Sequence, residues 1–224
     1  MSDCERLSSN RLFKGLDVGV IRNLLEEISY KKTVYQKNDI IAMDGDKVYG
    51  QYIMLTGGVI GQMTNYQGKV VKIEDIEGCQ LIAPAFLYGS DNHYPVDIIV
   101  SKPTEIIFIE KENFSYLLHI NTTVQQNFLN IISGKTQFLS NKIKFLALQP
   151  IKGKIASYIL KRTRNNPGNT IVLPYSQENL ADLFGVTRPA LARAFGELTQ
   201  DQILDIKGKK ITVLNEHELK TLIQ

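Results

Sequence analysis

The chain has 224 residues, of which 43% are hydrophobic, and a formal net charge of +3. This size and apolar content exclude a disordered protein and allow one large hydrophobic core or two small ones, and we expect two domains. Residues 149–224 carry 11 Lys and Arg against 7 Asp and Glu, whereas residues 1–148 carry 15 against 16, so the excess positive charge is C-terminal. By itself this charge fits either an ordinary solvated surface or an anionic partner.

No apolar run approaches the roughly 20 residues that a membrane-spanning helix needs, and the polar start MSDCERLSSN lacks the pattern of a secretory signal. We therefore expect a cytoplasmic protein without membrane contact. The two cysteines, Cys4 and Cys79, are too few for a disulfide framework and cannot supply the four thiolates of an iron–sulfur cluster. We expect both to be reduced thiols and no metal site.

Residues 10–30 have helical spacing, with Leu16, Val20, Leu24 and Ile28 recurring on one face. From residue 31 to 110 the pattern changes to short β-branched and aromatic runs, such as QYIMLTGGVIGQM and TEIIFIE. The segments DGD, TGG, YQGK and EGC between them supply glycines for turns. Many short strands at this spacing predict a β-sandwich, roll or barrel.

A stretch without proline, residues 122–149, follows the strands and predicts one long helix. Apolar positions in it alternate by three and four residues, as in a coiled-coil seam. The positions of this predicted seam are Leu129, Ile132, Thr136, Leu139, Ile143 and Leu146. The stripe fits either a helix of a second copy or the chain's own β-rich domain. Pro150 ends the helix, and IKGKIASYILKRTRNNPG predicts another helix followed by a Pro-Gly break.

The segment from Ser176 to Phe195 predicts two short helices joined by a tight turn. Ser176 is a suitable N-cap for the first helix, and Gly185 suits a left-handed residue at its end. Thr187 is a suitable N-cap for the second helix, which would begin with Arg188 and Pro189. The apolar contact between the helices would be made by Leu180, Ala181, Phe184, Val186, Leu191 and Ala194.

The following ILDIKGKKITVL predicts a two-stranded wing with a basic tip at Lys207, Lys209 and Lys210. A capped turn, arginines on the second helix and a basic hairpin together indicate a winged helix-turn-helix that binds DNA, although a helical hairpin without a DNA role has the same spacing. Arg188 and Arg193 lie five residues apart and so differ by about 140° around the helix. Each can read a guanine edge or contact a phosphate.

An enzyme is not indicated, because no phosphate-binding loop or paired nucleophile and base is found and the histidines, His93, His119 and His217, are isolated. A nucleotide-binding regulatory subunit would lack the helix-turn-helix.

The whole chain resembles the cyclic-AMP receptor and fumarate–nitrate regulator (Crp/Fnr) superfamily of bacterial transcription factors, most specifically in GVTRPALARAF and IKGKKITVL. The resemblance implies an α+β fold: a cupin-like β-roll effector domain of the cyclic-nucleotide-binding type at 1–121, a dimerisation helix at 122–149, and a winged helix-turn-helix at 150–224. It also implies a homodimer, a palindromic site on double-stranded DNA and a contact with RNA polymerase. The DNA-binding residues implied are Ser176, Gln177, Thr187, Arg188, Pro189, Ala190, Arg193 and Lys209.

The resemblance also indicates where an effector would bind. Pro84 stands at the family's ribose-binding glutamate, and Tyr94 and Pro95 stand at its phosphate-binding Arg-Ser pair. None of them can replace those groups, so cyclic AMP is not expected. The effector pocket implied comprises Ile82, Ala83, Pro84, Ala85, Tyr94, Pro95, Leu139 and Ser140.

The stretch GCQLIAPAFLYGSDNHYPVDII is similar to the family branch that regulates hybrid-cluster-protein genes under nitrosative stress, in which haem has been implicated as the sensor. Haem needs an axial ligand, and Cys79, His93, Tyr94 and Met63 are the candidates. Haem, nitric oxide or another small molecule would then be the effector. The alternative is a constitutive dimeric regulator whose β-roll is only a scaffold.

Overall fold

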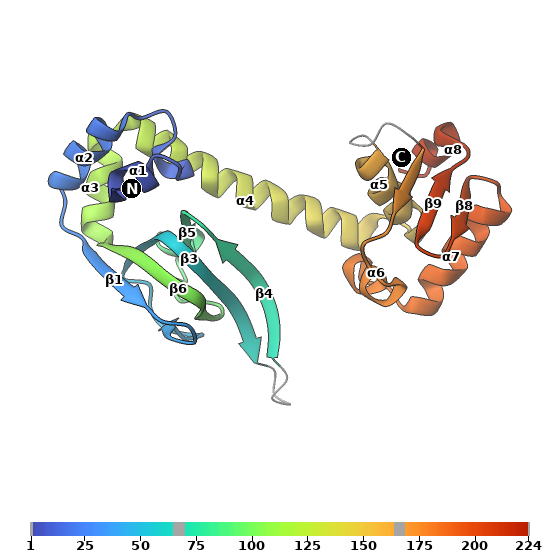
Figure 1. Cartoon of the computed structure of the whole chain (residues 1–224), viewed down its shortest axis with the longest axis horizontal. Helices are drawn as coiled ribbons and strands as arrows, with labels where there is room; N and C mark the ends of the chain where they lie inside the picture. The colour runs from blue at the N-terminus through green and yellow to red at the C-terminus, as the bar shows by residue number, and fades with distance from the viewer. Residues whose placement is uncertain (1, 65–69, 164–168, 224) are drawn as a thin grey trace. The chain divides into compact units, whose positions relative to one another are not determined.

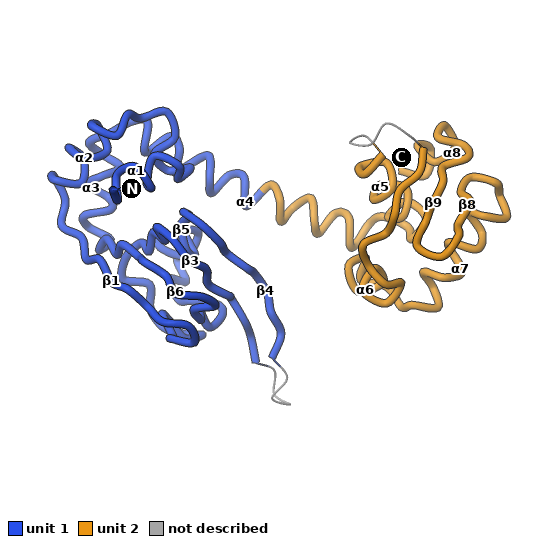
Figure 2. The backbone as a smooth tube through the Cα atoms, in the orientation of Figure 1, with its two compact units in different colours: residues 1–136 blue, residues 137–224 orange. Residues whose placement is uncertain are grey.

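The computed structural model describes residues 2–64, 70–163 and 169–223. The chain divides into two compact units, Met1–Thr136 and Gln137–Gln224 (Figure 2). The division lies inside the long helix α4 (Thr122–Leu148). The domain boundaries expected from the sequence, at the two ends of this helix, stay predictions. None of the described helices is both long enough and apolar enough to cross a bilayer.

The N-terminal helical segment differs from the single helix expected over residues 10–30. It contains α1 (Asp3–Leu7), the 3-10 helix η1 (Arg11–Phe13) and α2 (Val18–Glu26). The backbone turns at Gly15, which has a φ of +86°, so one helical face cannot continue across it. The predicted buried face was therefore wrong in part: Val20 is exposed, whereas Ile21 and Leu25 are buried.

The β-rich part of unit 1 is an antiparallel sheet with the strand order β1-β6-β3-β4, to which β2 adds on β6 and β5 on β3 (Figure 1). Its strands are β1 (Lys31–Tyr35), β2 (Ile40–Ala42), β3 (Gly50–Thr64), β4 (Val70–Glu77), β5 (Gln80–Ile82) and β6 (Asp97–Glu110). A short 3-10 helix, η2 (Pro84–Phe86), follows β5, and α3 (Lys111–Ile120) leads from β6 towards α4. The expected mixture of helices and antiparallel strands is confirmed.

Two strands are longer than the sequence patterns suggested, with 15 residues in β3 and 14 in β6. The TGG segment is therefore not a turn between strands. Gly57, with a φ of +97°, lies within β3 where the pairing with β6 shifts, and a side chain there would collide with Thr104. Gly45 and Gly78 do have the positive φ values expected of turn glycines. The predicted YQGK turn lies outside the described residues.

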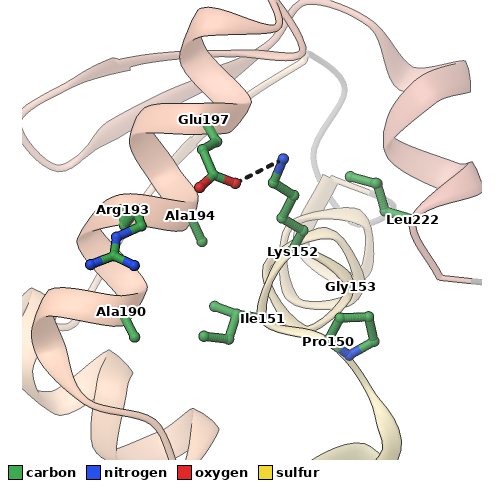
Figure 3. Close-up of a pocket in the computed structure, with 9 residues that line it drawn as sticks. All are labelled: Pro150, Ile151, Lys152, Gly153, Ala190, Arg193, Ala194, Glu197 and Leu222. Atoms are coloured by element: carbon green, nitrogen blue, oxygen red, sulfur yellow. Dashed lines mark ion pairs between the residues drawn. The ribbon is translucent and has the colours of Figure 1, made fainter.

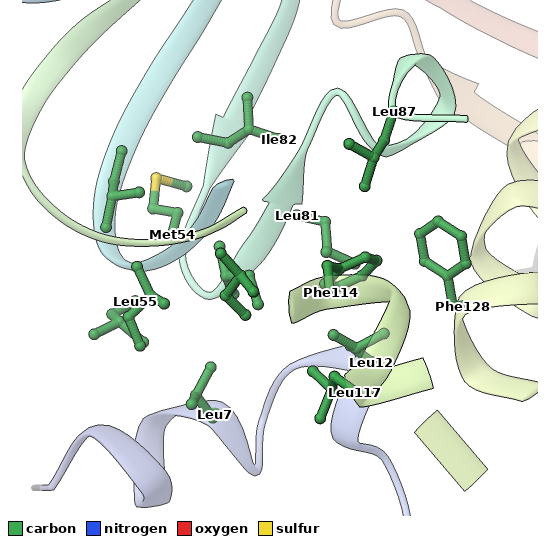
Figure 4. Close-up of a cluster of buried hydrophobic side chains, with 14 of the residues drawn as sticks. Leu7, Leu12, Met54, Leu55, Leu81, Ile82, Leu87, Phe114, Leu117 and Phe128 are labelled. Carbon is green, nitrogen blue, oxygen red and sulfur yellow. The ribbon is translucent and has the colours of Figure 1, made fainter. Parts of the chain in front are cut away.

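The core of unit 1 packs the N-terminal helices and α3 against the sheet, and Phe128 of α4 joins it (Figure 4). The ring of Phe114 lies 5.3 Å from that of Phe128 in an edge-to-face arrangement. Leu7 and Leu12 from the N-terminal segment are fully buried in the same cluster. The first half of α4 is thereby attached to unit 1.

An ion-pair network connects α1 to the sheet. The carboxylate of Glu105 on β6 lies 2.7 Å from Arg6 Nη1 and 3.0 Å from Lys32 Nζ on β1. Lys32 also lies 2.8 Å from Asp3 Oδ1. Hydrogen bonds from Lys32, together with the charge of Arg6, hold the pKa of Glu105 below its usual value.

In its described residues, unit 2 combines the end of α4 with four further helices and a small sheet. Its elements are α5 (Ile151–Thr163), β7 (Thr170–Val172), α6 (Gln177–Phe184), α7 (Arg188–Gln200), β8 (Leu204–Lys207), β9 (Lys210–Val213) and α8 (Glu216–Thr221). The sheet has the order β7-β9-β8. The expected Pro-Gly break after α5 lies outside the described residues.

Candidate nucleic-acid interface

The turn between α6 and α7 has the local structure that the sequence predicts. Ser176 Oγ accepts the backbone N–H of Asn179 at 3.1 Å, and Thr187 Oγ1 accepts that of Ala190 at 3.4 Å. Each hydroxyl satisfies an N–H that the first turn of a helix leaves unpaired. Gly185 between them is left-handed, with φ +62° and ψ +41°. The caps fix where α7 begins and therefore which side chains its first turn presents.

The contact between α6 and α7 is apolar, as expected. Leu180, Ala181, Phe184, Leu191 and Ala194 are all buried, and Val186 packs against them while half-buried. The burial of one face of each helix leaves the opposite face of α7 in solvent.

The predicted DNA-binding residues lie mostly on that solvent face and at the helix N-termini. Those that are exposed are Ser176, Gln177, Thr187, Arg188, Pro189, Arg193 and Lys209, whereas Ala190 is half-buried. In the described part of the chain, Arg188, Arg193 and Lys209 form no ion pair. Their charges are therefore available to an anionic ligand.

The predicted wing is a hairpin of β8 and β9, in which Lys207 pairs with Lys210 across a two-residue loop. Gly208 in this loop has a φ of +62°, which a glycine adopts without strain. Lys209, the other loop residue, projects at the tip and is exposed. The pattern of residues did not predict β7, which pairs with β9 as the third described strand of this sheet. Only the long-range pairing of Thr170 with Thr212 reveals it.

A second feature that the sequence did not reveal lies beside Arg193. A groove of about 390 Å³ runs between the start of α5, one face of α7 and Leu222 (Figure 3). At its edge Lys152 Nζ lies 3.0 Å from Glu197 Oε2 and 3.5 Å from Asp201 Oδ2. The hydrogen bond that Lys152 donates to the Glu197 carboxylate raises the pKa of Lys152. Lys152 thus offsets the charges of Glu197 on α7 and of Asp201, which follows the helix.

The predicted seam of α4 is largely exposed. Leu139 is 58% exposed and Ile143 66%, and Leu129, Thr136 and Leu146 also face solvent. Ile132 differs, because it packs half-buried against the core of unit 1. Phe138 and Leu148, which the heptad pattern did not include, are exposed as well. Between residues 136 and 143 the helix therefore displays exposed apolar side chains, Phe138, Leu139 and Ile143, that have no partner in the described residues.

The predicted effector-pocket residues differ in how deeply they are buried. Ile82, Pro84 and Tyr94 are buried, and Ala83, which is left-handed at φ +47°, is half-buried. Burial raises the pKa of the Tyr94 phenol strongly, so this side chain stays neutral. Ala85, Pro95, Leu139 and Ser140 are exposed, and the last two belong to unit 2.

The candidate axial ligands for haem are not brought together. Cys79 is half-buried beside Asn10, whose Nδ2 lies 3.6 Å from its sulfur, and burial raises the pKa of the thiol. Met63 lies six residues along β3 from Gly57, whose carbonyl accepts the N–H of Gly78 at 3.1 Å, and is thus separated from Cys79 by roughly 20 Å of strand. His93 is exposed, with Nδ1 2.6 Å from Asp91 Oδ1. No group of three metal-ligating side chains occurs within the described ranges.

Comparison with known proteins finds similarity within the second unit and over most of the chain. Residues 153–222 match the model of the Crp-like helix-turn-helix domain. The chain is 23% identical over 185 residues to the global nitrogen regulator of Nostoc sp. strain PCC 7120, covering 80% of this chain and 83% of that protein. It is 22% identical over 203 residues to the transcriptional activator FnrL of Cereibacter sphaeroides, covering 86% and 79%.

The crystal structure of the Thermus thermophilus catabolite activator protein is similar in fold. The TM-score is 0.57 at 17% identity, and the match covers 95% of this chain and 98% of that one. Both sequence relatives are transcription regulators, which agrees with the expectation that this chain is not an enzyme.

Proposed function

We propose that this Crp/Fnr-type DNA-binding transcription regulator recognises a palindromic site on double-stranded DNA as a homodimer. The observation that carries the proposal is the exposure of Arg188 and Arg193 on α7, with Lys209 exposed at the tip of the wing. An arginine on a helix in the major groove donates two hydrogen bonds to a guanine edge, whereas a lysine on a wing contacts phosphate as a point charge.

The two helix N-termini would hold the protein on the DNA backbone. Ser176, Gln177 and Thr187 lie where α6 and α7 begin, and free N–H groups and the helix dipole favour phosphate at such positions. Pro189 stands where many members of the family have a base-reading glutamate. Ala190 and Pro189 can instead offer apolar contacts to thymine methyl groups.

The homodimer is proposed from the exposed stripe of α4. Leu139 and Ile143 are apolar and exposed, and contact with the same stripe of a second copy would remove both from water. Two copies related by a two-fold axis would present two recognition helices to two half-sites, which is why the DNA site is expected to be palindromic. The family also implies contact with RNA polymerase.

For the effector we propose a small molecule other than cyclic AMP, with haem or nitric oxide as candidates from the resemblance to the hybrid-cluster-protein regulators. The predicted pocket residues and axial ligands stay predictions. A specific observation favours the second candidate, a constitutive regulator: Ile82 and Tyr94 are 2% and 4% exposed and already belong to the core of unit 1.

Selection from a pool of randomised duplexes tests the DNA-binding proposal. The purified protein is expected to enrich an inverted repeat, and recovery of no common sequence would contradict the proposal. Titration of the protein with haem, a nitric oxide donor and cyclic AMP, while affinity for the selected duplex is followed, then separates the two candidates. A constitutive regulator would show the same affinity in every titration.

A further inference from the structure

Lys154 on α5 is a buried cation bonded to two backbone carbonyls. The residue is 4% exposed, and its Nζ donates to the carbonyl oxygen of Leu146 at 2.8 Å and to that of Phe184 at 3.0 Å. No carboxylate lies within ion-pair distance of it in the described part of the chain. Burial of an ammonium group without a carboxylate partner costs folding free energy unless its N–H groups find acceptors. The two carbonyls are those acceptors, so the side chain links the two segments to which they belong.

The first carbonyl lacks its usual donor because of a proline. In an α-helix the carbonyl of residue 146 would accept the N–H of residue 150, and residue 150 is proline, which has none. Leu146 lies two residues before the last residue of α4. Lys154 reaches back from the first turn of α5 and supplies the missing donor.

The second carbonyl belongs to the last residue of α6. In a continued helix this carbonyl would accept the N–H of residue 188, but the chain leaves the helical path at Gly185, which is left-handed. Helix C-termini carry partial negative charge, and one cation between two of them interacts favourably with both. Lys154 therefore supplies the missing hydrogen-bond donor both to the carbonyl at the end of α6 and to the carbonyl near the end of α4.

Apolar contacts surround this cation and join the same two elements. The ring of Phe145 on α4 lies 5.8 Å from that of Phe184 in an edge-to-face arrangement. A Cβ at Gly185 would lie 3.4 Å from Leu146 Cδ2, so the end of α4 lies directly against the turn. The ammonium of Lys154 is also 6.0 Å from the centre of the Phe145 ring.

We propose that Lys154 is a positioning residue for DNA recognition, which ties the last turns of α4 to the turn between α6 and α7. The inference rests on the proposed DNA binding. Through this tie, any reorientation of α4 beyond Phe145 is passed to the start of the recognition helix, because Pro150 does not act as a free joint. Lys154 itself touches no DNA.

The test compares Lys154→Met, which keeps the length of the side chain but removes its donors, with Lys154→Arg, which keeps donors. Hydrogen exchange of the free protein is measured by mass spectrometry, and affinity is measured on the duplex selected above. In Lys154→Met we expect about tenfold faster exchange in peptides covering 143–149 and 182–187, with peptides of β8 and β9 unchanged, and about tenfold weaker DNA binding. Lys154→Arg should recover most of both effects, and Lys161→Met, an exposed lysine on the same helix, should leave this exchange unchanged.

Pro150→Ala provides an independent arm, because it restores an N–H that the Leu146 carbonyl can accept. In this background the effect of Lys154→Met on residues 143–149 should be about threefold smaller. The same background keeps the test open if Lys154→Met alone fails to fold. The proposal would be overturned if Lys154→Met exchanged at the wild-type rate in every peptide, or if it bound the duplex as tightly as the wild type. Failure of the wild-type chain to select any duplex would instead overturn the proposed function. The exchange rates of the free protein would still show whether Lys154 ties α4 to the turn between α6 and α7.

Discussion

Gly153 of α5 lies against the backbone carbonyl of Leu222, which follows α8. A Cβ at residue 153 would stand 2.7 Å from that oxygen, closer than two such atoms can approach. We expect Gly153→Ala to destabilise unit 2 by about 1–3 kcal/mol, because α5 and α8 must move apart. Thermal unfolding of the purified variant measures this.

Gly196 in α7 is the matched control. Nothing lies within 4 Å of the position that its Cβ would occupy. Gly196→Ala should therefore stabilise the protein by about 0.5–1 kcal/mol through its higher helix propensity. An equal loss of stability in both variants would mean that the close approach to Leu222 does not matter.

The α4 stripe can be tested without disturbing either core. Leu139 and Ile143 are both more than half exposed, so Leu139→Glu with Ile143→Glu should leave each unit folded. In a dimer these charges would be buried at a two-fold seam at a cost of several kcal/mol, and the protein should become monomeric by light scattering. Asn141→Glu, an exposed position between them in the sequence, is the control and should remain dimeric. A double variant that stays dimeric would remove the seam from the proposal.

Arg193 and Lys209 should differ in what they contribute to DNA binding. If Arg193 reads a guanine, Arg193→Ala should cost about 1–3 kcal/mol on the selected site and relax preference at one symmetric base position. If Lys209 contacts only phosphate, Lys209→Ala should weaken all sequences alike and reduce the salt slope by about one unit. Binding to selected and scrambled duplexes across a salt series measures both. Unchanged sequence preference in Arg193→Ala would show that α7 does not read DNA through this residue.

Cyclic AMP and cyclic GMP should leave DNA affinity unchanged. Pro84 is buried and has no carboxylate for a ribose, and Tyr94 is a neutral phenol where a cation would be needed for the phosphate. Isothermal calorimetry checks binding directly. Micromolar binding of either nucleotide would contradict the prediction that unit 1 lacks a cyclic-nucleotide site.

The network around Glu105 predicts a specific acid sensitivity. The pKa of Glu105 is lowered from 4.5 in the folded chain, chiefly by its hydrogen bond from Lys32. Its contribution to stability is therefore fully present above about pH 4.5 and is lost as the pH falls through the lower, folded pKa. The Tm of Glu105→Gln should fall less steeply on acidification than that of the wild type. Glu110→Gln, at a more exposed ion pair with Lys31, should keep the wild-type slope.

Features that depend only on neighbouring residues could be predicted from the amino-acid sequence. The caps at Ser176 and Thr187 and the left-handed Gly185 involve contacts spanning no more than five residues, and residue type alone favours them. The helical period of α4 and the exposed arginines of α7 follow from the same local geometry. The helix-turn-helix could be predicted for this reason.

Features that depend on contacts between distant residues could not be predicted in this way. The start of the chain illustrates this: helical spacing placed Val20 on the buried face, but packing in the core of unit 1 buried Ile21 instead. The length of β3, with Gly57 inside it, depends on its pairing with β6, and no pattern within the strand specifies that pairing.

The tie at Lys154 shows the same distinction most clearly. In the sequence Lys154 is one basic residue in an amphipathic helix, and such residues are usually exposed. It is buried because α4 ends at a proline and α6 ends at a tight turn, and folding brings the two free carbonyls of Leu146 and Phe184 to the same place. Pro150 and the turn after α6 can each be recognised in the sequence. Only the packing of α4, α5 and α6 brings both of them to the ammonium of Lys154.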